Sequence, residues 1–168
     1  MGLGSLYFKM IKREYYKDIP MGLLVLNWLV QRIFRINSEV PFSTNFSSRI
    51  SNYKFIEVPL SSQLSFAVSN GCYIVGSKNG LLKIGEGVIF ANNVCIQTRN
   101  HGLMNRRDFE CRAVEIGDNC WLGNSCTILP GVQLGKNVTV GANSVVTKSF
   151  PDNVVVGGCP AKIIKHLN

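Results

Sequence analysis

The sequence predicts a mainly β protein made of short repeats, with a helical segment before the repeats and one loop that protrudes from them. From Ile84 to Val146 an apolar residue recurs every six positions, and the register is broken once, between Ile96 and Ile116. A period of six matches neither the 3.6 of helices nor the 2 of ordinary strands. With 168 residues the chain is expected to form one domain with a buried core.

The composition agrees with a compact fold and limits the partners. Apolar residues make up 46% and charged residues 17%, with 16 Gly and 6 Pro, which excludes a disordered or collagen-like chain. The net charge of +8 favours a phosphate-bearing ligand, an anionic membrane surface or nucleic acid. In residues 1–54 eight bases outnumber three acids, so most of the excess charge lies in the first third of the chain.

The first expected element is a helix over residues 20–36. Asp18 is a candidate N-cap, Pro20 suits the first turn, and Pro41 lies just beyond the end. The ten-residue apolar run within it is half the length that a membrane-spanning helix needs, about twenty residues, and no signal-peptide cleavage site follows it. We therefore expect a cytoplasmic protein.

The polar stripe of this helix is narrow, because only Asn27, Gln31 and Arg35 recur at four-residue spacing among apolar neighbours. Such a helix needs burial on more than one side. Packing against the rest of the protein or a neighbouring subunit is the ordinary interpretation. The alternative is peripheral contact of residues 1–36 with the inner face of a membrane, basic residues outward.

The repeats that follow are hexads in two blocks. The first position is apolar, at Ile84, Phe90 and Ile96, and then at Ile116, Leu122, Ile128, Leu134, Val140 and Val146. Glycine often follows, as at Gly117 and Gly123, where a turn asks for a positive φ or a close approach of backbone. The fifth position is small, at Val88, Val94, Cys120, Cys126, Val132, Val138 and Ser144. We expect positions one and five to point inward.

The six cysteines form no CxxC pair, and a chain of this length does not need disulfide staples. They are expected to be reduced. Cys120 and Cys126 fall on position five and are predicted to be interior packing residues rather than redox or metal ligands.

In these hexads the chain resembles the hexapeptide-repeat acyltransferases. The resemblance implies a left-handed parallel β-helix with three hexads in each coil, a handedness that the period alone does not reveal. It divides the chain into an N-terminal helical, basic segment (1–45) and a β-helix domain (46–168) with a C-terminal tail. Upstream of Ile84 one or two irregular coils are expected, headed by Ile50, Ile56, Val68 and Ile74.

The interruption, residues 101–113 (HGLMNRRDFECRA), is predicted to leave the coil as a loop. Within the family, the stretch IQTRNH resembles the segment that ends in the catalytic histidine, so the resemblance assigns His101 as general base. A neutral imidazole with a pKa near 6.5 can take a proton from an acceptor hydroxyl. Without that context His101 is a surface residue. The loop charges Arg106, Arg107, Asp108 and Glu110 either orient His101, touch acceptor or are simply solvated.

Further site residues come from the same resemblance. Trp121 is similar to a tryptophan that borders the active-site cleft and is expected to face outward toward a ligand or a subunit, and Asn70 lies near the place of an acceptor-binding asparagine. The C-terminal coils and tail resemble those that hold coenzyme A. This resemblance assigns cofactor contacts to Ala142, Thr147, Lys148 and Lys165. The alternative for Lys148 is an ordinary solvated charge.

The resemblance implies an acetyl-CoA-dependent O-acetyltransferase that acts on a hydroxyl of a sugar or surface polysaccharide precursor, in a homotrimer with active sites between subunits. Direct attack on the thioester needs no covalent enzyme intermediate. N-acetylation of an amino sugar, and a non-catalytic β-helix scaffold, are the alternatives. We expect no metal, because one internal histidine does not make a zinc site, and no nucleic acid, because no zinc-finger spacing or stacking motif is present.

Overall fold

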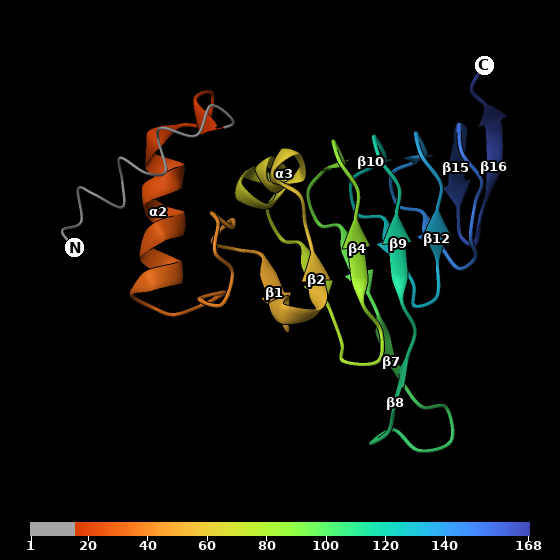
Figure 1. Cartoon of the computed structure of the whole chain (residues 1–168), viewed down its shortest axis with the longest axis horizontal. Coiled ribbons are helices and arrows are strands. Elements are labelled where there is room, and N and C mark those ends of the chain that lie inside the picture. The colour runs from red at the N-terminus through yellow and green to blue at the C-terminus, as the bar shows by residue number, and fades with distance from the viewer. Residues whose placement is uncertain (1–15) are drawn as a thin grey trace.

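The computed structural model describes residues 16–168, and from β1 onward this part of the chain winds into a parallel β-helix with three sheets (Figure 1). The first sheet has the order β1 (Arg49–Ser51), β3 (Tyr73–Val75), β6 (Cys95–Gln97), β11 (Thr127–Ile128) and β14 (Val145–Val146). The second has the order β16 (Ala161–His166), β15 (Val154–Gly158), β13 (Thr139–Val140), β10 (Trp121–Leu122) and β5 (Ile89–Phe90). The third has the order β12 (Gln133–Leu134), β9 (Val114–Ile116), β4 (Leu82–Ile84) and β2 (Ile56–Glu57).

Successive coils stack in register, and this confirms three hexads per coil. Ile84 pairs with Ile116, Phe90 with Leu122 and Ile96 with Ile128, all in parallel. Every predicted hexad head and every predicted position-five residue is buried. The last pair of strands differs, because β16 folds back antiparallel on β15.

The backbone at the corners between sheets shows which of the two expected roles glycine has, a positive φ or a close approach of backbone. Gly117 and Gly123 do not have positive φ; instead a Cβ at Gly117 would lie 2.5 Å from the Gly135 carbonyl oxygen. Close approach of stacked backbones therefore explains this position. In seven of the nine hexads positive φ falls two residues later, mostly on asparagine, which tolerates the left-handed region better than most residues with a side chain. These residues are Gly87, Asn93, Asn119, Ser125, Gly131, Asn137 and Asn143.

The predicted loop is present. It is an antiparallel hairpin of β7 (Arg99–His101) and β8 (Phe109–Cys111) that projects from the side of the β-helix (Figure 1). The chain leaves the coil slightly earlier than expected, because Thr98 is the last buried residue before the hairpin.

The irregular coils upstream are partly as predicted. Ile50 pairs with Ile74, and Ile56 pairs with Leu82. The prediction for Val68 was wrong: it lies in α3 (Gln63–Val68) and is 40% exposed. This short helix covers β5 in place of a further strand, since Phe90 N–H donates to Ser65 Oγ and the rings of Phe66 and Phe90 pack edge to face at 4.9 Å. Short 3-10 helices, η2 (Tyr53–Phe55) and η3 (Leu60–Ser62), complete this region.

The N-terminal helix, α2 (Met21–Arg32), is shorter than the predicted 20–36. Asp18 does not cap it; Pro20 occupies the N-cap position and no side chain bonds there. The helix lies across the N-terminal end of the β-helix (Figure 1).

The orientation of α2 also corrects the expectation. Asn27 and Gln31 of the polar stripe are buried, whereas several apolar side chains face solvent. The polar side is buried because the segment beneath it, residues 42–46, has backbone groups that need hydrogen-bond partners. Asn27 and Gln31 supply them.

All six cysteines are free thiols, and Cys72, Cys120 and Cys126 are buried. Burial raises the pKa of Cys126 to about 12 and that of Cys120 to about 11. Such thiols act as packing residues, as predicted for the last two.

Candidate active site

His101 is the last residue of β7, at the point where the hairpin leaves the β-helix. Its Nδ1 lies 2.6 Å from the carbonyl oxygen of Arg106. A carbonyl oxygen can only accept, so a neutral His101 carries its hydrogen on Nδ1, and Nε2 keeps its lone pair. The ring also packs against Phe109, with centroids 4.7 Å apart. The imidazole is thus held in one orientation with an acceptor nitrogen at the surface.

Hydrogen bonds within the loop hold the Arg106 carbonyl in place. The Arg106 guanidinium donates to the Gly102 carbonyl at 2.9 Å, and Gly102 N–H donates to the Asp108 carbonyl at 2.9 Å. Asn105 Nδ2 donates to the Asp108 carboxylate at 2.9 Å. Of the loop charges considered from the sequence, Arg106 therefore orients His101, through its main chain.

A pocket of about 200 Å³ opens beside the ring. It is lined by Tyr73, Val75, Gln97, Arg99, Asn100, His101 and Phe109. Sequence reasoning missed every member except His101. The alternation of inward and outward residues was an available signal, because Tyr73 and Gln97 flank the inward residues Ile74 and Ile96. The strand pairing that brings Tyr73 and Gln97 to one pocket, however, depends on the coil register.

The pocket lining is basic. Arg99 stacks over the Phe109 ring at 4.8 Å, a cation–π contact, and the lining includes no Asp or Glu. The site therefore suits a neutral or anionic ligand.

Two of the predicted cofactor residues lie on the same corner of the β-helix as the hairpin. Thr147 and Lys148 follow β14, between the first and third sheets, and both are exposed. The hairpin leaves and rejoins the same corner, where Arg112 N–H donates to the Thr98 carbonyl. The Lys148 ammonium lies 5.8 Å from the centre of the Phe150 ring.

Asn70 and Ala142 lie on the opposite edge of the first sheet. Asn70 N–H donates to Asn92 Oδ1 at 3.0 Å, and Asn92 in turn accepts from Ser125 N–H through its carbonyl. Ala142 lies at the same corner of the β-helix, one coil further along. Its backbone nitrogen is 2.7 Å from the position that a Cβ of Gly123 would take. Neither residue lines the His101 pocket.

Trp121 and Lys165 lie on the second sheet, a different face of the β-helix. Trp121 points outward, as predicted, and is 54% exposed between Ile89 and Thr139 of the adjacent strands. Lys165 is exposed on β16 and pairs with Val155. One copy of the chain therefore does not bring either residue to His101.

Within residues 16–168 no three His, Cys, Asp or Glu side chains are grouped so that they could hold a metal ion. None of the helices described there has the length and apolar character needed to cross a bilayer.

One ion pair is described in residues 16–168, between Lys136 Nζ and Asp118 Oδ2 at 2.9 Å. It joins neighbouring coils at the corner between the third and second sheets. Hydrogen bonding to Lys136 holds the pKa of the Asp118 carboxyl below its usual value, and the same contact raises the pKa of Lys136. The pair supports the coil stack and lies away from the His101 pocket.

Comparison with known proteins gives matches over the repeat region and over the whole fold. Residues 113–148 match the family model described as bacterial transferase hexapeptide (six repeats). WbbJ of Escherichia coli, provisionally named a lipopolysaccharide biosynthesis O-acetyl transferase, is 43% identical over 98 residues, 51% of this chain and 50% of WbbJ. The chain thus spans about half the length of this curated relative.

Two solved structures share the fold. A maltose O-acetyltransferase from Clostridium difficile is 25% identical with a TM-score of 0.54, over 97% of this chain and 89% of that one. A galactoside acetyltransferase in complex with coenzyme A is 21% identical with a TM-score of 0.55, over 90% and 85%. With its hexads stacked in register and these matches, the repeat region of the chain, residues 113–148, belongs to the bacterial transferase hexapeptide family, and the chain has the left-handed parallel β-helix of its structural neighbours.

Proposed function

We propose that this chain transfers an acetyl group from acetyl-CoA to a hydroxyl of a sugar or surface polysaccharide precursor, with His101 as general base. The observation that carries the proposal is the hydrogen bond between His101 Nδ1 and the Arg106 carbonyl. It leaves Nε2 as the proton acceptor beside a pocket large enough for part of a small polar ligand.

The chemistry follows from that tautomer. Nε2 takes the proton of the acceptor hydroxyl as its oxygen attacks the thioester carbonyl carbon, and the Arg106 carbonyl stabilises the imidazolium that forms. When the tetrahedral intermediate collapses, the C–S bond breaks and the imidazolium returns the proton to the leaving thiolate. The products are the acetyl ester and free coenzyme A, and the histidine ends as it began.

For the donor we propose the corner that carries Thr147 and Lys148, with Ala142 and Lys165 as further contacts. The exposed Lys148 and Lys165 match the phosphates of coenzyme A in charge. The neighbouring galactoside acetyltransferase structure contains coenzyme A, which supports the same class of donor here.

For the acceptor we propose a sugar hydroxyl bound at the His101 pocket, with Asn70 as a further contact. The names of WbbJ and of the maltose O-acetyltransferase, which refer to lipopolysaccharide biosynthesis and to maltose, support this class.

We further propose a homotrimer in which each active site lies between two subunits. His101 is at the edge of the first sheet, whereas Trp121 and Lys165 are on the outer face of the second. Because two faces of one β-helix cannot meet, a cleft that contains all three needs a second copy. We propose the cytoplasm as the compartment, since six free thiols, with Cys159 exposed, persist in a reducing environment.

The test is mass spectrometry of acetyl transfer to hydroxyl sugars and amino sugars, with calorimetric titration of acetyl-CoA. We expect His101→Ala to lower the rate of transfer about 10²- to 10⁴-fold while acetyl-CoA still binds. His166→Ala, which changes the only other histidine, is the matched control and should leave the rate unchanged.

Other outcomes are equally informative. Transfer to amines alone would replace the O-acetyltransferase proposal with N-acetylation. Absence of acetyl-CoA binding to folded protein would remove the enzyme proposal and favour a scaffold role.

A further inference from the structure

The N-terminal end has exposed apolar side chains on α2 and on the chain just after it. On α2 the exposed side chains include Met21, Val25 and Leu26, and the chain after the helix continues the surface. We call the following set the α2 surface: Met21, Val25, Leu26, Ile33, Phe34 and Ile36. Ile33 is 59% and Phe34 71% exposed. Large apolar side chains gathered in exposed positions on one end of a folded protein indicate an interaction site.

The α2 surface is held outward by the hydrogen bonds on the opposite side of the helix. Asn27 Oδ1 accepts from Phe46 N–H at 2.9 Å, and Asn27 Nδ2 donates to the Ala67 carbonyl at 3.0 Å. Gln31 Oε1 accepts from Thr44 N–H at 3.0 Å.

Gln31 also donates to the Phe42 carbonyl at 3.0 Å. Turning the helix to bury its apolar side would break these buried bonds and leave their partners unsatisfied, which is costly. The outward position of the α2 surface is therefore a stable property of the fold.

The charges around the α2 surface are Lys17, Arg32 and Arg35, with Asp18 and Glu39 just outside its two ends. From residue 19 to residue 38 the chain contains Arg32 and Arg35 and no acid. Lys17 is exposed immediately before the helix, next to Asp18. An apolar strip bordered by cations matches a bilayer that contains anionic lipids, because apolar side chains enter the acyl boundary and the cations stay at the headgroups.

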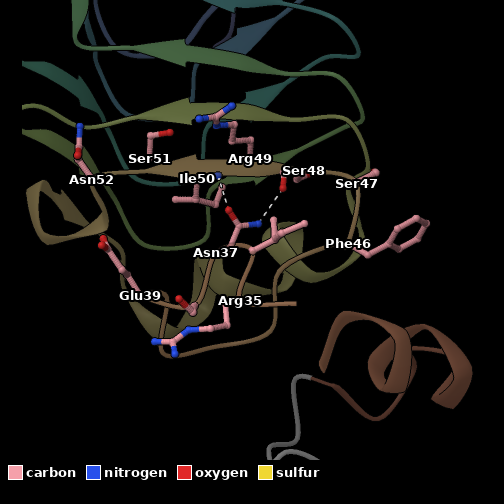
Figure 2. Close-up of a pocket in the computed structure, with 12 residues that line it drawn as sticks. Arg35, Asn37, Glu39, Phe46, Ser47, Ser48, Arg49, Ile50, Ser51 and Asn52 are labelled. Carbon is pink, nitrogen blue, oxygen red and sulfur yellow. Dashed lines mark hydrogen bonds between the residues drawn. The ribbon is translucent and has the colours of Figure 1, made fainter. Parts of the chain in front are cut away.

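A pocket of about 650 Å³ has Ile36 of the α2 surface in its lining. Figure 2 shows the pocket and the residues that line it. It lies between residues 35–39 and β1, where Asn37 bonds to the edge of the strand through Ile50 N–H and the Ser48 carbonyl. Arg35, Ile36 and Arg49 line it, with Glu39 as its one acid. Neither arginine has a carboxylate within salt-bridge distance in the described part of the chain. The pocket thus offers two cations and apolar contact to a lipid headgroup.

The position of α2 in the molecule fits a planar partner. Figure 1 shows α2 at one extreme of the long axis, with the β-helix extending away from it. A membrane can meet this end without contacting the three sheets or the β7–β8 hairpin. The sheets then remain available for the subunit contacts of the proposed trimer.

We propose that the α2 surface docks the protein on anionic membrane, with Lys17, Arg32 and Arg35 at the headgroups. The inference does not depend on the proposed acetyl transfer, because docking requires neither acetyl-CoA nor acceptor. It describes contact with one face of a bilayer.

The test is co-sedimentation of the full chain with vesicles of phosphatidylcholine alone and with phosphatidylglycerol in equal parts, at low and physiological salt. Wild type is expected to bind the anionic vesicles, and the double variant Ile33→Ser with Phe34→Ser to bind roughly tenfold less or weaker still. Lys17→Gln and Arg35→Gln are each expected to weaken binding about fivefold, and added salt should do the same.

The matched control is Ile163→Ser with Ile164→Ser, which removes a comparably exposed apolar pair (40% and 69%) from β16 at the other end of the molecule. It should bind vesicles as wild type does. Circular dichroism melts of all variants check that the fold is intact.

Three results would overturn the proposal. The first is no binding of wild type to anionic vesicles at low salt. The second is equal binding by wild type and the Ile33/Phe34 double variant. The third is dissociation of the oligomer by that variant in analytical ultracentrifugation, which would make the α2 surface a contact between copies of this chain.

Discussion

The regular coils, from β4 to β14, and the N-terminal end, from α2 to β1, differ in how many polar side chains they bury. Inside the coils are Ile, Leu, Val and Cys, with Leu122, Cys126 and Ile128 fully enclosed. At the N-terminal end Asn27, Gln31 and Asn45 are enclosed beside apolar side chains such as Val40 and Phe42. Ile33 and Phe34 face solvent.

The difference arises from backbone hydrogen bonding. In the coils the strand backbone groups bond to the coil above or below, so the interior needs few polar side chains. The chain that covers the first coil has no such neighbour, and side-chain amides take the place of the missing strand. Asn37, for example, bonds to Ile50 N–H and the Ser48 carbonyl on the open edge of β1. The N-terminal end of this β-helix is thus closed partly by polar side chains, and several apolar side chains of α2 and of the chain after it remain exposed.

The largest contrast between the regions is expected in thiol reactivity. Cys126 lies in a regular coil and Cys72 in an irregular one, and burial raises the pKa of both thiols. Because the irregular end has fewer stacked hexads, it should open locally more often. Timed alkylation with mass spectrometry should modify the exposed Cys159 first, then Cys72, and Cys126 only near global unfolding. Equal rates for Cys72 and Cys126 would contradict the comparison.

Truncating a leucine to alanine should change the free energy of unfolding by different amounts in the two regions. Leu122 is fully buried, whereas Leu26 on α2 is 40% exposed. Leu122→Ala is expected to lower the free energy of unfolding by about 2–5 kcal/mol, because it leaves a cavity. Leu26→Ala should change it by no more than about 0.5 kcal/mol. Urea denaturation measures both, and a large loss for Leu26→Ala would mean that α2 is buried in solution.

Exchanging polar and apolar side chains on α2 tests the same comparison, with a smaller expected change in stability. Asn27→Leu increases apolar character yet should destabilise the protein by about 1–3 kcal/mol, because Phe46 N–H and the Ala67 carbonyl lose their partner. Val25→Asn, a polar change on the exposed side of the same helix, should be within about 0.5 kcal/mol of wild type. Thermal unfolding measures both variants. If the helix buried its apolar side, Val25→Asn would be the less stable of the two.

The smallest effect is expected at the Asp118–Lys136 pair on the surface of the coils. Lys136 lowers the pKa of Asp118 from its ordinary 3.8 in the folded state. The stability from this bond is therefore complete above pH 3.8 and is lost as the pH falls through the lower folded-state pKa. Asp118→Asn should flatten the acid limb of the stability curve slightly, and salt should mask the difference. An unchanged acid limb at low salt would show that the pair contributes nothing.

The hexads explain why much of the fold could be predicted. A repeat that must stack on itself leaves one arrangement for its apolar positions, so the buried heads and the protruding loop followed from spacing. The coil length and the handedness came from the family resemblance. Val68 was misassigned because its spacing fits the repeat, although α3 covers that side of the coil.

The candidate site was predictable only in part. His101 stands at the break in the repeat, where the sequence points to it, but Tyr73 and Gln97 reach its pocket through strand pairing between residues more than twenty positions apart. The tautomer depends on the Arg106 carbonyl, a backbone group that no side-chain pattern reveals.

The sequence by itself determined the repeat, the residues inside it, the position of the loop and its histidine, and an apolar helix with a narrow polar stripe. Only the tertiary structure decided which side of that helix is buried and which predicted residues share a face. The physical reason is that periodicity specifies what a segment can bury, whereas unpaired backbone groups of distant segments decide where its polar side chains are needed.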